Sequence, residues 1–204
     1  MPGAVAVADE RGRDPLGAAE VAWPDRADDG YTIRPATPAD LPRLPAIERA
    51  AATRFRDTAF AAMVDAPLAA TAIDPLHERV WVATAADGAL VGFAIAHPLD
   101  AGVHLHELDV HPTHARHGLG ARLIGAVAAW AAGTDVRAIT LLTFRDIPWN
   151  APYYARLGFI PLADEALPPG LRALRDAEGL AGLPAAARLA MRLDVGERSK
   201  ICGG

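Results

Sequence analysis

A glycine-containing segment in the middle of the chain has the residue types of an anion-binding turn. It reads Leu108-Asp109-Val110-His111-Pro112-Thr113-His114-Ala115-Arg116-His117-Gly118-Leu119-Gly120-Ala121 and leads into an apolar run with helical spacing. Unpaired N–H groups at a helix start bind phosphates, and glycine lets an anion approach the backbone closely. Arg116 and His117 can add positive charge. The segment therefore predicts a phosphate or pyrophosphate site.

Two better-known phosphate-binding patterns do not fit this segment. The dinucleotide-binding pattern needs a third glycine, and the Walker loop needs Gly-Lys followed by Ser or Thr; neither is present here. On spacing alone, an ordinary glycine turn before a helix explains the segment equally well. The turn by itself therefore predicts an anion site without identifying the anion.

A second segment, toward the C-terminus, places two tyrosines side by side in a short helix. It reads Trp149-Asn150-Ala151-Pro152-Tyr153-Tyr154-Ala155-Arg156-Leu157-Gly158-Phe159. Asn150 is expected to cap this helix and Gly158 to end it. Successive helical residues point about 100° apart, so the two tyrosines face different surroundings. We expect one in the core and the other with its hydroxyl at a cleft, although two core or rim aromatics are the commoner arrangement.

The apolar pattern predicts the elements that must position these two segments. Strands are expected at 31–34, 80–84, 89–96, 103–110, 138–143, 159–161 and 188–193, with a hairpin turn at Asp87-Gly88. Helices are expected from a Thr37 cap to about 54, and over 60–70, 119–132, 151–157 and 171–180. This order indicates an α/β fold on a mixed sheet.

Composition excludes several classes of protein. The chain has 204 residues, 51% hydrophobic and 22% charged, as in ordinary globular domains. Its 20 Lys and Arg against 25 Asp and Glu give a net charge of −5, which argues against a nucleic-acid or anionic-membrane binder. No apolar run reaches the ~18 residues of a membrane span. The N-terminus lacks a secretion-signal pattern, so a cytoplasmic location is expected.

In combination, these motifs resemble the GNAT superfamily of acetyl-CoA-dependent N-acyltransferases. The combination consists of Glu107 on a strand, Val110-His111-Pro112, the glycine turn and, about thirty residues later, Tyr154-Ala155-Arg156-Leu157-Gly158-Phe159. The resemblance extends from about Tyr31 to Asp194. It implies a GNAT-type mixed β-sheet, splayed at its centre and flanked by helices, with acetyl-CoA as co-substrate.

The resemblance also implies roles for individual residues. Glu107 would be the general base for the acceptor amine, and Tyr154 the general acid for the departing thiolate. An amide near Val110 would stabilise the oxyanion. The cofactor-binding residues implied are the strand residues Leu108, Asp109 and Val110 for pantetheine, the turn residues Arg116, His117, Gly118, Leu119, Gly120 and Ala121 for pyrophosphate, and Asn150 for pantetheine.

Three features depart from the family pattern. Ala115 stands where the family usually has Gln or Arg at the start of the turn. Asn150 precedes Tyr154 by four residues, whereas the family's asparagine precedes it by seven, where Ile147 stands. The base could instead be Asp109 or a histidine across the cleft.

Several histidines raise the alternative of a metal site. His104 and His106 lie two apart on a strand and could share a face, with His111, His114 and His117 nearby. Spacing indicates no third ligand, and the one cysteine, Cys202, excludes a cysteine-ligated zinc site. The sequence therefore predicts no metal.

We expect acetyl transfer to a primary amine of a small molecule, such as an amino acid, a polyamine or an amine antibiotic. Protein or peptide N-acetylation and a non-catalytic acyl-CoA-binding regulatory module are the alternatives. Arg172 and Arg175 would either meet an acidic substrate or form a solvated basic face. A homodimer through an exposed sheet edge is possible.

The chain is expected to contain one catalytic domain between two terminal extensions. Residues 1–29, rich in Ala, Gly, Asp, Arg and Pro, are interpreted as a flexible arm. Residues 30–195 form the N-acetyltransferase domain, and 196–204 a C-terminal tail.

Overall fold

The structure, a computed structural model, describes residues 29–134, 136, 138–180 and 183–195. The predicted arm, apart from Asp29, and the predicted tail lie outside these residues. No helix in the described part of the chain combines the length and the hydrophobicity needed to cross a bilayer.

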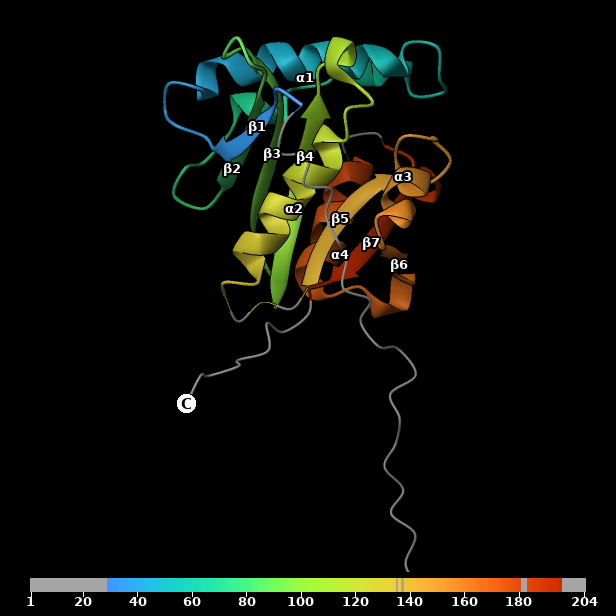
Figure 1. The fold of residues 1–204 in the computed structure, drawn as a ribbon. Helices are drawn as coiled ribbons and strands as arrows, with labels where there is room; N and C mark the ends of the chain where they lie inside the picture. The colour runs from blue at the N-terminus through green and yellow to red at the C-terminus, as the bar shows by residue number, and fades with distance from the viewer. Residues whose placement is uncertain (1–28, 135, 137, 181–182, 196–204) are drawn as a thin grey trace, which may run out of the picture.

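The described residues form one seven-stranded mixed sheet in the order β1-β2-β3-β4-β5-β7-β6 (Figure 1). All neighbouring strands are antiparallel except β4 and β5, which are parallel. The α/β class predicted from the order of elements is confirmed. The strands are Thr32–Pro35 (β1), Arg79–Thr84 (β2), Leu90–Leu99 (β3), Gly102–Val110 (β4), Ala138–Phe144 (β5), Ile160–Pro161 (β6) and Arg188–Asp194 (β7).

The sheet opens between β4 and β5. These strands, both fully described, pair only at Val103 with Ile139 and at His104 with Thr140. Beyond His104, the edge of β4 that faces β5 therefore has no strand partner. Because backbone N–H and C=O groups need partners when they leave water, this edge is ready to pair with an extended ligand. The predicted central splay is confirmed.

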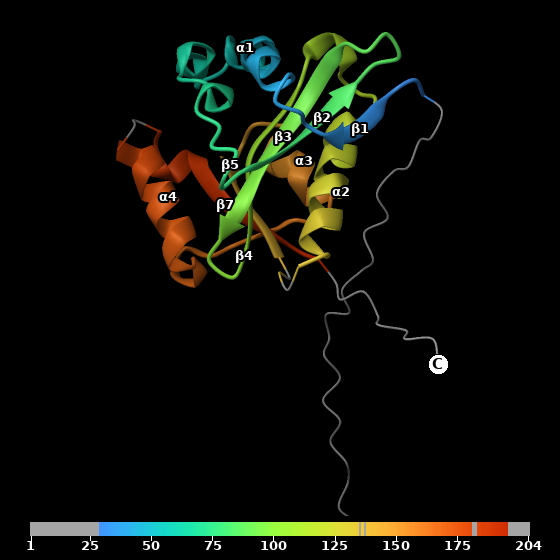
Figure 2. The same cartoon turned by 90° about the vertical axis from the view of Figure 1, so that its left-hand side faces the viewer.

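Helices cover both faces of the sheet (Figure 2). Leu119–Ala131 (α2) and Ala151–Arg156 (α3) lie on one face, where Leu123, Ile124 and Val127 pack in the largest core cluster. Leu44–Ala52 (α1) and Pro169–Leu180 (α4) lie on the other face, where Leu44 and Leu171 are fully buried. The site described below is built where these two layers meet the opening between β4 and β5.

Two helical predictions were wrong in detail. Thr37 does not cap the first helix; instead, the buried Asp40 carboxylate accepts hydrogen bonds from the Thr37 N–H and hydroxyl at 2.7 and 2.8 Å. Arg34 donates to the same carboxylate at 2.7 and 3.0 Å. These bonds hold the entry as a turn, so a 3-10 turn starts at Leu41 and α1 at Leu44.

The helix predicted over 60–70 is also absent from the described structure. Its place is taken by two 3-10 turns, Ala61–Asp65 and Ala69–Thr71. Pro67 forces the preceding Ala66 into an extended conformation, with ψ of 154°, and the helix cannot continue through it. The other predicted elements form within a few residues of their expected ends.

Candidate active site

A β-bulge in β4 determines which face carries the predicted base. Ile95 pairs with Glu107 and Ala96 with Leu105, so His106 is an extra residue in the ladder. Leu105 belongs to the core cluster under α2, whereas the carboxylates of Glu107 and Asp109 lie with Glu48 of α1 on the opposite face. Without the bulge, residues two apart would share a face and Glu107 would point into the α2 core.

Glu107 lies at the open edge of β4. Its Oε1 accepts a hydrogen bond from the Leu108 N–H at 3.1 Å. The His111 N–H donates to Val91 of β3 at 2.8 Å, and N–H directions alternate along a strand. The N–H groups of Leu108 and Val110 therefore point away from β3, toward the opening. The predicted base and the predicted oxyanion donor thus lie along the same edge.

Three carboxylates converge at this position. Carboxylate oxygens of Glu48, Glu107 and Asp109 lie within 4.8 Å of one another. Burial, reinforced by the charge of Glu48, raises the pKa of Glu107 to about 7, against the opposing effect of the Leu108 hydrogen bond. Burial and the charges of Glu107 and Glu48 also raise the pKa of Asp109, while Arg54 opposes the shift. The pair can take up a proton near neutral pH, so Asp109 stays an alternative base.

Aromatic rings gather at the end of β5, and two arginines that act electrostatically on the carboxylates, Arg54 and Arg188, pack on them. The ring centroids of Phe60 and Phe55 lie 4.2 and 5.4 Å from that of Phe144 at the end of β5. The Arg54 guanidinium lies 4.6 Å from the ring centroid of Trp149. Arg54, Phe55 and Phe60 belong to residues 53–60, between α1 and the Ala61–Asp65 turn. Phe144 and Trp149, their partners, lie far from them in the sequence. No periodicity in the sequence indicated this cluster.

Arg172 and Arg175, for which the sequence left open an acidic substrate or a solvated basic face, make contacts within the protein. Arg175 pairs with Asp164 at 2.5 Å, and Arg172 donates to the Leu167 carbonyl at 3.3 Å, so both bind the segment leading into α4. Arg188 of β7 was missed by sequence analysis. It makes two hydrogen bonds to Glu178 of α4, at 2.8 and 2.6 Å, and lies 4.6 Å from the Phe144 ring centroid.

The predicted anion-binding turn has a backbone shape that can accommodate an anion. Arg116 and Gly118 have φ of 67° and 73°, and α2 begins at the next residue, Leu119. The first intrahelical bond runs from the Arg122 N–H to Gly118, which leaves the N–H groups of 119–121 without helical acceptors. Arg116, His117 and Gly118 are exposed. The turn therefore presents N–H groups and a cation to solvent at a helix N-terminus.

Tyr31, near the N-terminal end of the described residues, contacts the predicted anion-binding turn. Its hydroxyl hydrogen-bonds His114 Nδ1 at 3.0 Å, and its ring centroid lies 5.1 Å from that of His117. Arg122 donates to the Tyr31 carbonyl at 2.8 Å. Tyr31 and His114 are 83 positions apart in the sequence, which explains why no local signal indicated this contact.

The two tyrosines of α3 both pack against the core cluster of α2, with ring centroids 5.4 Å apart, but each has a different further neighbour. Tyr153 packs its hydroxyl against α2, where a Cβ placed on Gly120 would lie 2.6 Å from that oxygen. Tyr154 packs on Phe159, with centroids 5.6 Å apart. Burial, with the charges of Glu107, Tyr153 and Asp109, raises the pKa of Tyr154 above its usual range. Tyr154 therefore lies near the carboxylates and stays protonated, as a proton donor must.

Asn150 occupies the N-cap position of α3 but does not cap it, contrary to prediction. Its amide Nδ2 instead donates to Thr143 Oγ1 of β5 at 3.0 Å, and its Oδ1 is buried without a hydrogen-bond partner. An unpaired buried acceptor is costly, so this oxygen fits a ligand N–H such as those of pantetheine. The open β4 edge, the turn and Asn150 together fit acetyl-CoA.

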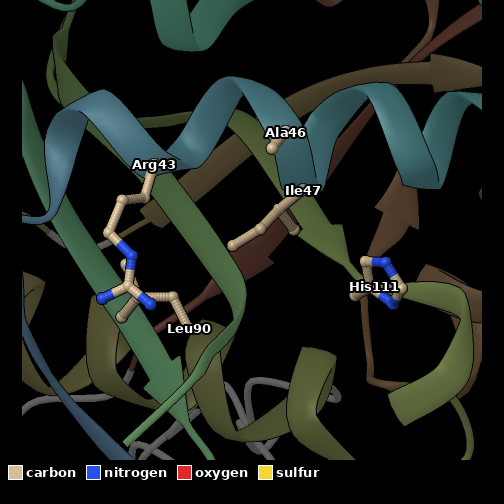
Figure 3. A pocket seen from close by; sticks show the side chains of 5 residues that line it. All are labelled: Arg43, Ala46, Ile47, Leu90 and His111. Atoms are coloured by element: carbon tan, nitrogen blue, oxygen red, sulfur yellow. The ribbon is translucent and has the colours of Figure 1, made fainter.

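A separate hollow of about 340 Å³ lies along α1 (Figure 3). Its described lining consists of Arg43, Ala46, Ile47, Leu90 and His111, without any of the three carboxylates. This hollow is therefore distinct from the carboxylate cluster.

The fold and this site define an acyl-CoA-dependent N-acyltransferase architecture. A sequence model of the acetyltransferase (GNAT) family matches residues 44–159, more than half of the chain. The chain therefore belongs to the GNAT family, whose activity is acyl-CoA-dependent N-acetylation.

Solved structures share the fold at low sequence identity. Ribosomal-protein-S18-alanine N-acetyltransferase from Escherichia coli is 18% identical, with a TM-score of 0.58 over 85% of this chain and 99% of that one. Nourseothricin acetyltransferase is 22% identical, with a TM-score of 0.53 over 82% and 99%. The paiA N-acetyltransferase from Thermoplasma acidophilum, solved with coenzyme A, is 14% identical, with a TM-score of 0.56 over 80% and 98%.

Proposed function

We propose that this protein transfers the acetyl group of acetyl-CoA to a primary amine of a small cationic molecule, such as a polyamine, an amino acid or an amine antibiotic. The observation that carries the proposal is the position of Glu107. Its carboxylate accepts the Leu108 N–H at the open edge of β4, and it converges with Asp109 and Glu48.

Glu107 acts as the general base. An alkylammonium group must lose a proton before its nitrogen can attack a thioester carbonyl. Glu107, with a pKa near neutrality, accepts that proton, and the freed lone pair of the nitrogen then forms the C–N bond. The Val110 N–H, directed into the opening, stabilises the negative charge on the carbonyl oxygen.

Tyr154 completes the transfer as the general acid. When the C–S bond breaks, the electron pair goes to sulfur, and the Tyr154 hydroxyl supplies the proton. The raised pKa of Tyr154 keeps this hydroxyl protonated. Acetyl-CoA supplies the activated acetyl group; the backbone of 108–110, the N–H groups of 116–121 and Asn150 Oδ1 are the groups proposed to bind it.

The acceptor face favours a compact cation over an extended peptide. Three carboxylates within 4.8 Å attract positive charge, and the rings of Phe55, Phe60 and Phe144 provide an apolar, π-rich surface beside them. Phe60, which precedes the Ala61–Asp65 turn, and Arg188, which hydrogen-bonds Glu178 of α4, both pack on Phe144. An acidic face with aromatic side chains close by favours a small amine with one or more positive charges.

A comparison of acceptors tests the proposal. The purified protein is given acetyl-CoA with a polyamine, a basic amino acid, an aminoglycoside or an alanine-initiated peptide, and thiol release is followed. A kcat/KM at least 100-fold higher for one of the small amines is expected. A higher value for the peptide would identify a protein acetyltransferase. Acetyl-CoA binding without turnover of any acceptor would identify a regulatory module, and both outcomes would overturn the proposal.

A further inference from the structure

A second polar cluster lies outside the acetyl-transfer machinery. It consists of Glu78, just before β2, His97 near the end of β3, and His106, the bulge residue of β4. One ligand atom from each residue lies within 4.8 Å of the others. Glu78 and His97 are largely shielded, with 12% and 20% of their side chains exposed, and His106 is accessible at 45%. The cluster is therefore partly buried and open on one side.

The spacing of the donor atoms matches one metal ion. Glu78 Oε1 lies 3.0 Å from His106 Nδ1 and 3.6 Å from His97 Nδ1. Ligand bonds of roughly 2.0–2.2 Å in a tetrahedral zinc site place donor atoms about 3.3 Å apart. The observed distances lie on either side of this value. Small side-chain movements would therefore bring all three atoms to bonding distance of one ion.

A buried nitrogen without a hydrogen-bond partner indicates a ligand at the same place. His97 Nδ1 is buried and has no hydrogen-bond partner. A buried polar atom without a partner is uncommon because its desolvation is not compensated. A metal ion bound between His97 and His106 would satisfy it.

The residues around the cluster hold the ligands in place. Glu78 Oε2 accepts the Asp74 N–H at 2.9 Å, which leaves Oε1 directed at the histidines. The His97 ring packs beside His104, with centroids 5.4 Å apart, and His104 hydrogen-bonds Thr140 at 3.3 Å. Such outer contacts orient metal ligands in known sites.

We propose that Glu78, His97 and His106 bind one divalent transition-metal ion, with zinc as the favoured ion. Two imidazoles and one carboxylate form a ligand set that zinc accepts, with a fourth position left for water. The ion would fasten the 72–78 segment to the β3–β4 hairpin. This site differs from the sequence prediction of no metal, because two of its three ligands come from outside the histidine pair that the spacing indicated.

Zinc binding to defined variants tests the proposal. The background is the full chain carrying Cys202→Ser, which removes the lone thiol as a ligand. Zinc chloride is titrated against a chromophoric chelator, and thermal unfolding is followed with zinc, magnesium or EDTA. We expect one zinc ion per chain and a midpoint rise of roughly 5–10 °C at 100-fold excess over Kd, with no rise in magnesium.

His106→Gln and Glu78→Gln should each weaken zinc binding at least tenfold and remove the thermal shift. His77→Gln is the matched control, because His77 also pairs with a carboxylate, Asp74 at 2.6 Å, but belongs to no group of three metal-ligating side chains among the described residues. His106 is exposed, so its variant should fold even if substitutions at His97 do not. Unchanged zinc affinity in His106→Gln, or no zinc binding by the parent chain, would overturn the proposal.

Discussion

Leu105 and Glu107 are two residues apart on β4 but face opposite sides of the sheet, because His106 between them is an extra residue opposite β3. This bulge directs an acid to the acceptor face and keeps the leucine in the core. The same extra residue supplies the accessible ligand of the proposed metal site. One irregularity in the ladder therefore arranges both features.

Removal of the Glu107 carboxylate should slow acetyl transfer without weakening acetyl-CoA binding. Glu107→Gln keeps the side-chain shape and its acceptor for the Leu108 N–H but cannot take up a proton. We expect kcat/KM to fall by about 10²- to 10⁴-fold with the best acceptor, whereas exposed Glu165→Gln leaves it unchanged. A larger loss in Asp109→Asn than in Glu107→Gln would transfer the base role to Asp109.

The pH dependence should report a base with a pKa of about 7. Because the base works only when deprotonated, the ratio of wild-type to Glu107→Gln kcat/KM should rise about tenfold per pH unit below 7 and level off above it. Charged groups that act on Glu107 are Glu48 on α1, His106 on β4 and Arg188 on β7, and the charge of Glu107 in turn raises the pKa of Asp109.

Glu48→Gln tests the cause of this raised pKa. Burial of Glu107 is its largest contribution and the charge of Glu48 the second, so loss of that charge should move the midpoint to lower pH. The profiles are measured with EDTA present, so that no bound cation contributes. A midpoint that stays fixed or moves upward would show that Glu48 does not act on the base.

The two neighbouring tyrosines should respond differently to removal of their hydroxyls. Tyr154→Phe removes the proposed proton donor and should lower kcat by roughly 10²-fold while acetyl-CoA affinity stays the same. Tyr153→Phe is the matched control, since its hydroxyl packs against Gly120 and its pKa is raised by burial, without a contribution from a carboxylate. Equal kcat losses in the two variants, measured by steady-state thiol release, would contradict the assignment.

Gly120 and Tyr153 should show energetic coupling. An alanine Cβ at 120 would lie 2.6 Å from the Tyr153 hydroxyl oxygen, so Gly120→Ala must displace that ring from the start of α2. We expect a cost of about 1–3 kcal/mol in stability and weaker acetyl-CoA binding. Adding Tyr153→Phe should recover part of both, as a double-mutant cycle by thermal unfolding and calorimetry would measure. Strict additivity would show that the two sites do not interact.

The Arg34–Asp40 pair should make the free energy of unfolding depend on pH in the acidic range. The hydrogen bonds from Arg34 hold the pKa of Asp40 well below its usual range, so its stabilisation is present above the unfolded-state pKa and lost as pH falls through the folded-state pKa. Asp40→Asn should cost roughly 1–3 kcal/mol at pH 7. The difference from wild type should shrink as pH falls below about 4, as urea unfolding would measure. A constant difference across this range would contradict the linkage.

Local signals in the sequence determined most elements and the cofactor half of the site. The strands, α2 and the turn at Gly118 follow from apolar periodicity and from backbone conformations that glycine adopts readily. The turn is proposed to bind through its own backbone, so its residues are contiguous and can be read from one segment. The different directions of the Tyr153 and Tyr154 side chains likewise follow from helix geometry alone.

Only the tertiary structure decided the acceptor half of the site. The bulge at His106 has no residue signature in β4, yet it reverses the face of Glu107. Glu48, Arg188 and Phe60 reach the site from separate segments of the chain. Glu78, His97 and His106 likewise come from three different segments. The physical reason is that side-chain clusters depend on strand register and on packing between distant segments, whereas a helix start or a glycine turn depends on the few residues that form it.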